Sequence, residues 1–227
     1  MSMPSFYAPP EQVMKEKADY ARKGIARGRS LIGCQYSDGI LLVAENPSNT
    51  LRKISEIYDR IGFAGVGKYN EFDQLRQAGV RSADIKGYQY ARSDVDARSL
   101  ASIYARTMGS IFTHEAKPLE VEILVAEVGI TSDLDRLFHI LYDGTVMDES
   151  RFSVLGGDAE SIAERMSQLF TDHAALKDAL GAASQALGGS ERTLRADELE
   201  VAVLERNAHR RCFRRLDDDA VEELLRR

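Results

Sequence analysis

Apolar residues recur along the chain with two spacings, and each spacing predicts one kind of secondary structure. Apolar positions three or four residues apart, together with helix-boundary residues, indicate helices. The segments with these signals are 10–28, 70–91, 93–118, 158–170, 176–189 and 217–227. Short apolar runs bounded by turn residues indicate strands. These runs are 30–37, 40–45, 53–59, 61–66, 121–130, 135–144, 151–157, 199–207 and 210–216.

The order of these elements predicts the fold class. A helix is followed by four strands, two helices, more strands, two helices, further strands and a last helix. This order lacks the strand–helix alternation of a doubly wound parallel sheet. It predicts an α+β fold in which two packed antiparallel sheets lie between outer layers of helices. We expect a flexible tail at residues 1–9 and a single domain at residues 10–227.

Particular residues mark where the predicted elements begin and end. Pro10 suits the first turn of a helix, and Gly28 is a plausible stop for it. Asp94 or Asp96 can cap the second long helix, which Pro118 ends. In the first helix, the positions expected to share a modest apolar stripe are Val13, Lys17, Tyr20, Ala21 and Ile25.

Asp38 and Gly39 separate two apolar runs and predict a β-hairpin. A type I′ turn at this pair requires a positive φ at both residues, which Asp and Gly tolerate. A second Asp-Gly pair at residues 143–144 is expected to close the strand at 135–144.

Composition narrows the possible functions. The chain has 227 residues, of which 44% are hydrophobic and 29% are charged, as in an ordinary globular protein. Its net charge of −6 gives no reason to expect nucleic acid or an anionic membrane as a partner. The apolar runs are too short to cross a bilayer and residues 1–12 lack a secretory signal pattern, so we expect a cytoplasmic protein. Cys34 and Cys212 are expected to be reduced thiols, with a disulfide between them as the alternative.

The stretch GFAGVGKY, residues 62–69, nearly matches a nucleotide-binding phosphate loop. Its glycines and Lys68 have the right spacing, but Tyr69 stands where a compact Ser or Thr hydroxyl should bind magnesium. Phe63 and Val66 also suit a strand better than a loop. We therefore expect a strand whose small residues allow close approach to a neighbouring backbone.

No other motif points to chemistry. None of the histidines has a second ligand at metal spacing, so we expect no metal, no cofactor, and surface or capping roles. These histidines are His114, His139, His173 and His209. The basic stretch 205–215 is expected to be a strand with arginines on a solvated face, because acids follow directly at 217–219. A polyanion site is the alternative.

A series of segments, in the same order along the chain, resembles the α subunits of the proteasome core particle, and the actinobacterial type most closely. Residues 7–28 resemble the N-terminal helix of that family, including the Tyr20-Ala21-Arg22 that ends the family's signature. The stretch from Ser30 to Arg76 resembles its first sheet and the start of its first long helix. Residues 116–129 and 152–162 resemble its later sheet and the helix that follows. The resemblance covers essentially the whole chain.

This resemblance implies a four-layer αββα sandwich, the Ntn-hydrolase fold. Subunits of this type form homo-heptameric α rings that cap rings of proteasome β subunits. The β subunits carry the proteolytic N-terminal threonine and degrade protein substrates, which are pupylated in actinobacteria.

The resemblance also implies that this chain has no catalytic residue of its own. Alignment of the first strand by Gly33 places Arg29 at the nucleophile position, and arginine cannot attack a carbonyl. Glu45 and Lys53 fall near the columns of the acid and lysine that assist catalysis in β subunits. A self-processing Ntn-type hydrolase with its own N-terminal nucleophile is the alternative.

By the same resemblance, the N-terminus is expected to obstruct the entrance of the ring. The gate residues are Ser2, Met3, Pro4, Ser5, Phe6 and Tyr7. A hexameric AAA ATPase activator is expected to insert its C-terminal tails between neighbouring α subunits. Lys53 would pair with the tail carboxylate, Gly28 aligns with a small pocket residue, and Lys68 aligns with a position that is apolar in archaeal relatives.

Overall fold

The computed structural model describes residues 9–48, 50–190, 192–208 and 210–226. The predicted gate residues 2–7 and His209 therefore lie outside the described residues. The helices are α1 (Pro10–Ala26), α2 (Tyr69–Gln89), α3 (Ala97–His114), α4 (Ala159–Leu169), α5 (Leu176–Gly188) and α6 (Asp218–Leu225). The strands are β1 (Leu31–Tyr36), β2 (Gly39–Glu45), β3 (Ile54–Tyr58), β4 (Ile61–Gly67), β5 (Val121–Glu127), β6 (Arg136–Ile140), β7 (Val146–Glu149), β8 (Phe152–Leu155), β9 (Leu199–Glu205) and β10 (Phe213–Leu216).

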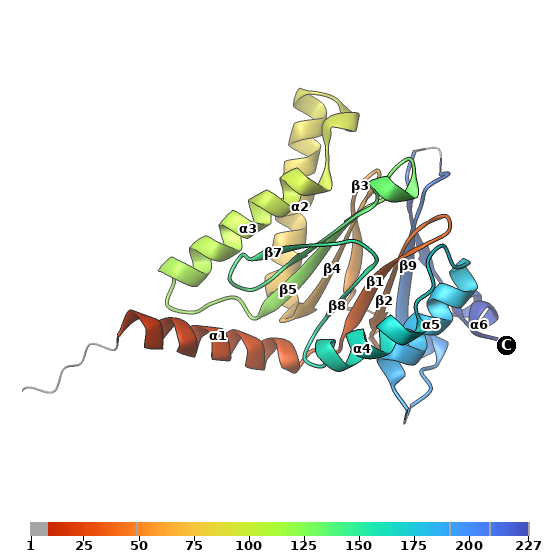
Figure 1. Cartoon of the computed structure of the whole chain (residues 1–227). Helices are drawn as coiled ribbons and strands as arrows, with labels where there is room; N and C mark the ends of the chain where they lie inside the picture. The colour runs from red at the N-terminus through yellow and green to blue at the C-terminus, as the bar shows by residue number, and fades with distance from the viewer. Residues whose placement is uncertain (1–8, 49, 191, 209, 227) are drawn as a thin grey trace, which may run out of the picture.

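The strands form two antiparallel five-stranded sheets packed face to face (Figure 1). Sheet one has the order β10-β9-β2-β1-β8, and sheet two has the order β3-β4-β5-β6-β7. Helices α4, α5 and α6 cover the outer face of sheet one, and α2 and α3 cover the outer face of sheet two. The predicted α+β sandwich of two sheets between helix layers is confirmed.

Alternating side chains of each central strand face two different apolar layers. In β1 and β2, Ile32, Leu41 and Val43 pack toward α4 and α5, whereas Leu31 and Leu42 pack toward sheet two. Because side chains in a strand alternate between faces, burial on both sides requires nearly continuous apolar sequence. This explains why these strands appear in the sequence as apolar runs without polar alternation.

The stretch 62–69 is a strand followed directly by a helix, so the phosphate-loop alternative is wrong. Strand β4 ends at Gly67 and α2 begins at Tyr69, which leaves no loop to surround a phosphate. A Cβ at Gly65 would lie 2.7 Å from the ring of Phe72, so glycine lets α2 pack closely on the strand. The close approach to a neighbouring backbone is confirmed at Gly67, where a Cβ would lie 2.0 Å from Glu120 O, whereas at Gly65 the neighbour is an aromatic side chain.

Helix α1 lies across one end of the sandwich (Figure 1). Ala21 and Ile25 are buried in the layer between the sheets, whereas Tyr20, a predicted member of the apolar stripe, is exposed. Lys17 leaves the stripe as well, since its Nζ donates to the carbonyl oxygens of Phe112 and Glu115 at 3.0 and 2.7 Å. These carbonyls lie at the C-terminal end of α3, where a positive charge is favourable.

Some element boundaries differ from the sequence prediction. The β1–β2 hairpin is confirmed, but its two loop residues are Ser37 and Asp38, because Tyr36 pairs with Gly39. Gly39 has a φ of 155°, whereas Asp38 does not have a positive φ, so the type I′ assignment is wrong. Helix α3 begins at the predicted cap Asp96, which accepts a hydrogen bond from Ser99 N.

Helices α1 and α3 both end before the residues predicted to stop them. Helix α3 ends at His114, before Pro118, and α1 ends at Ala26. The exposed edge strand β7 had no sequence signal. Both cysteines are free thiols in the structure, so the disulfide alternative is wrong. No helix in the described ranges is long and apolar enough to cross a membrane.

A buried ion pair closes the end of the sandwich opposite α1. Arg206 follows β9 and donates from both terminal nitrogens to the carboxylate of Asp135, at 2.7 and 2.9 Å. The Asp135 side chain is fully buried and also accepts from Gly129 N at 2.8 Å. This pair links the end of sheet one to the start of β6 in sheet two.

Asp135→Asn is expected to lower the free energy of unfolding by about 3–5 kcal/mol, because it leaves a buried guanidinium unpaired. Urea unfolding measures this loss. The matched control is Asp172→Asn, which removes the partner of Arg151 in an exposed pair and should cost less than about 1 kcal/mol. Equal losses in the two variants would contradict the structural role of the buried pair.

Candidate functional site

The three predicted docking residues converge where α1 joins β1. Lys53 Nζ donates to the carbonyl oxygen of Arg29 at 2.6 Å. Gly28 packs against Gly67, and a Cβ at Gly28 would lie 3.0 Å from Gly67 N. Lys68 follows Gly67 directly, so residues from α1, β3 and β4 that are distant in sequence share one surface region. The need for glycine at position 28 comes from this close approach.

The Lys53 ammonium is held by backbone carbonyls. Besides its bond to Arg29, Nζ donates to the carbonyl oxygen of Glu45 at 3.1 Å. An ammonium has three donors, so one donor remains for a further acceptor. Burial lowers the pKa of Lys53 to about 8, although the negative charges of Glu200 and Glu45 act to raise it. Lys53 is therefore a half-buried, preorganised cation and not a solvated lysine at a strand end.

Lys68 belongs to a separate ion-pair network. Its Nζ lies 3.6 Å from Glu71 Oε1 and 3.7 Å from Glu120 Oε2. Lys117 contacts the same two carboxylates at 2.7 and 2.9 Å. About half of the Lys68 side chain remains exposed, so Lys68 contributes positive charge to the surface near Gly28. Its ion pairs also connect α2 with the residue before β5.

The position expected for a nucleophile holds a salt bridge instead. The guanidinium of Arg29 pairs with the Glu45 carboxylate, which also pairs with Arg192. The hydrogen bond from Glu45 N to Ser30 O, at 3.1 Å, fixes the strand start beside this cluster. Helix α1 precedes Arg29, so the structure has no free α-amino group at the strand start. The cluster can bind and orient, but Arg29 supplies neither the hydroxyl or thiol nor the free α-amino group that an N-terminal nucleophile needs.

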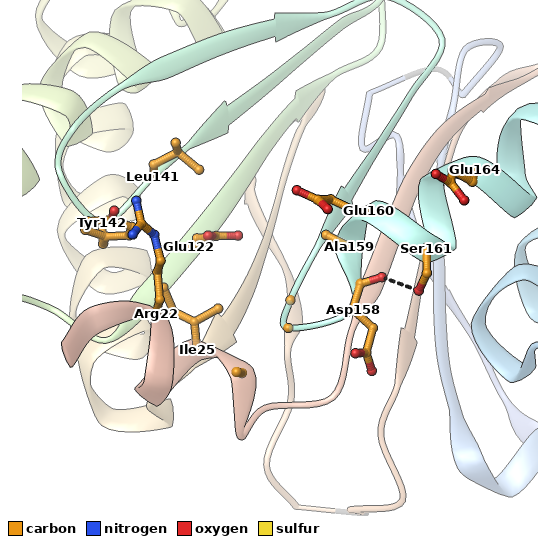
Figure 2. Close-up of a pocket in the computed structure, with 13 residues that line it drawn as sticks. Arg22, Ile25, Glu122, Leu141, Tyr142, Asp158, Ala159, Glu160, Ser161 and Glu164 are labelled. Atoms are coloured by element: carbon orange, nitrogen blue, oxygen red, sulfur yellow. Dashed lines mark hydrogen bonds between the residues drawn. The ribbon is translucent and has the colours of Figure 1, made fainter. Parts of the chain in front are cut away.

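A pocket of about 640 Å³ lies between α1, the end of β6 and the start of α4. Figure 2 shows the residues that line it. Arg22 lies over the ring of Tyr142, 5.7 Å from its centroid. Across the pocket, the Ser161 hydroxyl donates to the carbonyl oxygen of Asp158 at 3.1 Å. The described lining residues include the carboxylates of Asp158, Glu160 and Glu164 but no histidine, lysine or cysteine. The Ser161 hydroxyl donates to a backbone carbonyl and not to one of these carboxylates, so the described residues of the pocket show no serine paired with a base.

Glu200 is a functional candidate that the sequence analysis missed. It lies in β9, its side chain is 2% exposed, and it accepts from the backbone nitrogens of Lys53 and Ile54 at 2.8 and 3.1 Å. The signal was available, because Glu200 is a carboxylate inside the otherwise apolar run 199–204. A buried charge of that kind requires partners, but the sequence does not show which ones.

Four arginines of the basic stretch 205–215 form ion pairs within the chain. Arg206 is buried against Asp135, while Arg211, Arg214 and Arg215 pair with Glu56, Glu205 and Glu200. Arg211 and Arg214 are exposed, as expected for a solvated face, whereas Arg206 and Arg215 are not. The acids that pair with these four arginines are not residues 217–219, so that part of the expectation is wrong. The pairing gives no support to a polyanion site.

The described histidines differ in environment. His114 is exposed and lies 3.0 Å from Ser110 O near the end of α3, as expected for a surface or capping residue. His139 is buried and contacts Glu122 at 3.2 Å, so the surface expectation is wrong for it. His173 is exposed and has a φ of 57°. The described residues contain no group of three or more side chains suited to hold a metal ion.

Comparison with known proteins assigns the family. A family model described as proteasome subunit matches residues 25–204. A protein named proteasome subunit alpha from Acidimicrobium ferrooxidans is 63% identical over 225 residues, covering 99% of this chain and 97% of that relative. A protein of the same name from Thermomonospora curvata is 57% identical over 227 residues, covering 99% of this chain and 98% of that relative. The chain therefore belongs to the proteasome subunit family.

Proposed function

We propose that this chain is a non-catalytic α subunit of the proteasome core particle. The observation that carries the proposal is near full-length similarity to proteins named proteasome subunit alpha, at up to 63% identity among the relatives compared. In this role seven copies form each outer ring, and β subunits supply the threonine nucleophile. The ring admits protein substrates, including pupylated ones, to the cytoplasmic particle.

The salt bridge at Arg29 supports the non-catalytic assignment. Arginine provides no nucleophile, and its pairing with Glu45 occupies the carboxylate that would assist catalysis. Helix α1 buries Ala21 and Ile25 in the inter-sheet core, so its removal by self-processing would expose apolar surface. These contacts favour the α subunit over the self-processing hydrolase.

The convergence of Gly28, Lys53 and Lys68 supports a docking site for the C-terminal tails of a hexameric AAA ATPase. A terminal carboxylate would accept the remaining donor of Lys53 in a partly desolvated setting, where a charge-assisted hydrogen bond is strong. Gly28 keeps the adjoining surface free of a side chain. The gate assignment rests on the position of residues 2–7 in the sequence, shortly before α1. Pro9 caps this helix and Pro10 is its first residue.

Co-expression with a matching β subunit tests the main proposal. We expect a large cylinder by size-exclusion chromatography and peptidase activity that is lost when the β-subunit threonine is replaced. Mass spectrometry of the α chain should show an N-terminus near Met1 or Ser2. Absence of a cylinder, or cleavage before residue 29 or 30, would contradict the proposal.

Lys53→Ala should weaken binding of an ATPase tail peptide by about 10–100-fold, the value of one hydrogen bond to a charged group. The measurement is fluorescence anisotropy with the assembled particle, together with ATPase-driven protein degradation. Lys177→Ala, at an exposed position on α5, is the control and should behave as the wild type. Assembly should be unchanged in both variants, and wild-type affinity in the Lys53 variant would refute the docking assignment.

Tail binding should also weaken as the pH rises through about 8, the pKa of Lys53. Below this pH the ammonium is charged and attracts the tail carboxylate, and above it the neutral amine does not. A bound carboxylate raises the Lys53 pKa, so the midpoint should lie at or above 8. A tail peptide with an amidated C-terminus should lack this titration, and a pH-independent affinity of the free-acid peptide would argue against Lys53 as the carboxylate partner.

Deletion of residues 2–8 should raise hydrolysis of short peptides by the assembled particle, because it removes the segment expected to obstruct the entrance. Initial rates with a fluorogenic peptide measure this change. As a control, an activator is used to open the gate. In these open particles the deletion should change the rate of peptide hydrolysis little. Equal basal rates in the deletion variant and the wild type would show that these residues do not form the gate.

A further inference from the structure

A single buried carboxylate organises the polypeptide around Lys53. Glu200 Oε2 accepts hydrogen bonds from Lys53 N at 2.8 Å and from Asn46 Nδ2 at 2.7 Å. Its Oε1 accepts from Ile54 N at 3.1 Å and also from the guanidinium of Arg215. The carboxylate is therefore satisfied by four donors, which offsets the cost of burying its charge.

These bonds connect the two sheets at the end where the docking residues converge. Glu200 lies opposite Ala44 in sheet one, and it shares the inward face of β9 with Ala202 and Leu204. The backbone groups that it holds belong to the start of β3 in sheet two. Asn46 extends the link, because its amide also donates to the carbonyl oxygen of Leu51 at 2.8 Å. Glu200 thereby holds both the residue that follows β2 and the residues at the start of β3.

The charged groups around Lys53 come from several elements. Glu200 on β9 and Glu45 on β2 are negative, and Arg29 between α1 and β1 is positive. Arg215 on β10 neutralises part of the Glu200 charge, and Arg192 shares Glu45 with Arg29. Unlike Glu45, which pairs with two guanidinium groups, Glu200 both pairs with a guanidinium and holds the Lys53 backbone.

We propose that Glu200 is a positioning residue for the docking cation: it fixes the Lys53 backbone between the sheets and places a carboxylate near the ammonium. This inference rests on the proposed docking function of Lys53. Loss of the charge should lower the pH at which Lys53 becomes neutral, since the Glu200 charge acts to raise the Lys53 pKa. A purely structural carboxylate would have no such effect on binding.

Glu200→Gln keeps the shape of the side chain and removes the charge. Its amide oxygen can still accept from one of the two backbone nitrogens, whereas its amide nitrogen cannot accept. The assay is binding of a peptide of the last eight or so residues of the cognate ATPase to the assembled particle, across the pH range around 8. We expect the pH midpoint of binding to fall by about one unit relative to the wild type. Affinity at about pH 6, where Lys53 remains charged, should fall by no more than about tenfold, as expected when the bond to one backbone nitrogen is lost and the other is kept.

Asp135→Asn is the matched control. It also removes the charge of a buried carboxylate paired with arginine, but Arg206 and Glu200 lie at opposite ends of β9. This variant should lose stability without moving the pH midpoint of tail binding. A shift of the same size in both variants would overturn the inference, because it would reflect general destabilisation.

The outcomes distinguish the inference from the proposed function beneath it. Wild-type tail affinity in Lys53→Ala overturns the docking function itself. Weakened binding in Lys53→Ala with an unshifted midpoint in Glu200→Gln overturns only the role of Glu200.

If Glu200→Gln does not assemble, Glu200→Asp keeps the charge but shortens the reach to the two backbone nitrogens. That variant should bind the tail at least about tenfold more weakly at every pH, as expected for loss of one such hydrogen bond, and unchanged affinity would refute the positioning role.

Discussion

Burial of one apolar layer between two antiparallel sheets is the constraint on which the rest of the structure depends. The sheets pack through side chains such as Leu42, Leu124 and Leu204, all of them inaccessible to solvent. Each sheet is covered on its other face by helices, so the central strands are apolar on both faces. Polar side chains can then enter the layer only near the ends of the strands, where partners or water are available.

The two ends of the sandwich accommodate their charges differently. At the end distant from α1, Asp135 and Arg206 form a closed pair that is satisfied within the chain. At the α1 end, Glu200 and Glu45 are also paired, but Lys53 donates only to carbonyl oxygens and keeps one donor for a further acceptor. The first arrangement is suited to stability. The second leaves a cation available to an anionic partner, and this difference places the proposed docking function at the α1 end.

Local sequence patterns predicted most of the elements, because spacing reports which faces are buried. The two sheets, the helix pairs and the Asp96 cap follow from patterns within about 20 residues. Strand β7 was missed because its four residues are not buried and show no apolar pattern. The contacts that define the site join residues far apart in the chain, such as Arg192 with Glu45 and Lys53 with Glu200. Periodicity carries no information on such pairs, so Lys53 could be proposed from a resemblance, whereas Glu200 required the structure.

Helix α1 explains why a fold associated with self-processing hydrolases is suited here to a structural role. A hydrolase of this kind needs a free α-amino group at the start of its first strand, which requires removal of everything before it. In this chain that removal would expose the inter-sheet layer where Ala21 and Ile25 are buried. Loss of the Ile25 side chain alone would forfeit about 1.5–3 kcal/mol of apolar burial. The same helix brings Gly28 and the Arg29 carbonyl against Gly67 and Lys53. The packing that disfavours processing thus also builds the surface proposed for docking, so one element accounts for both the missing nucleophile and the position of the cation.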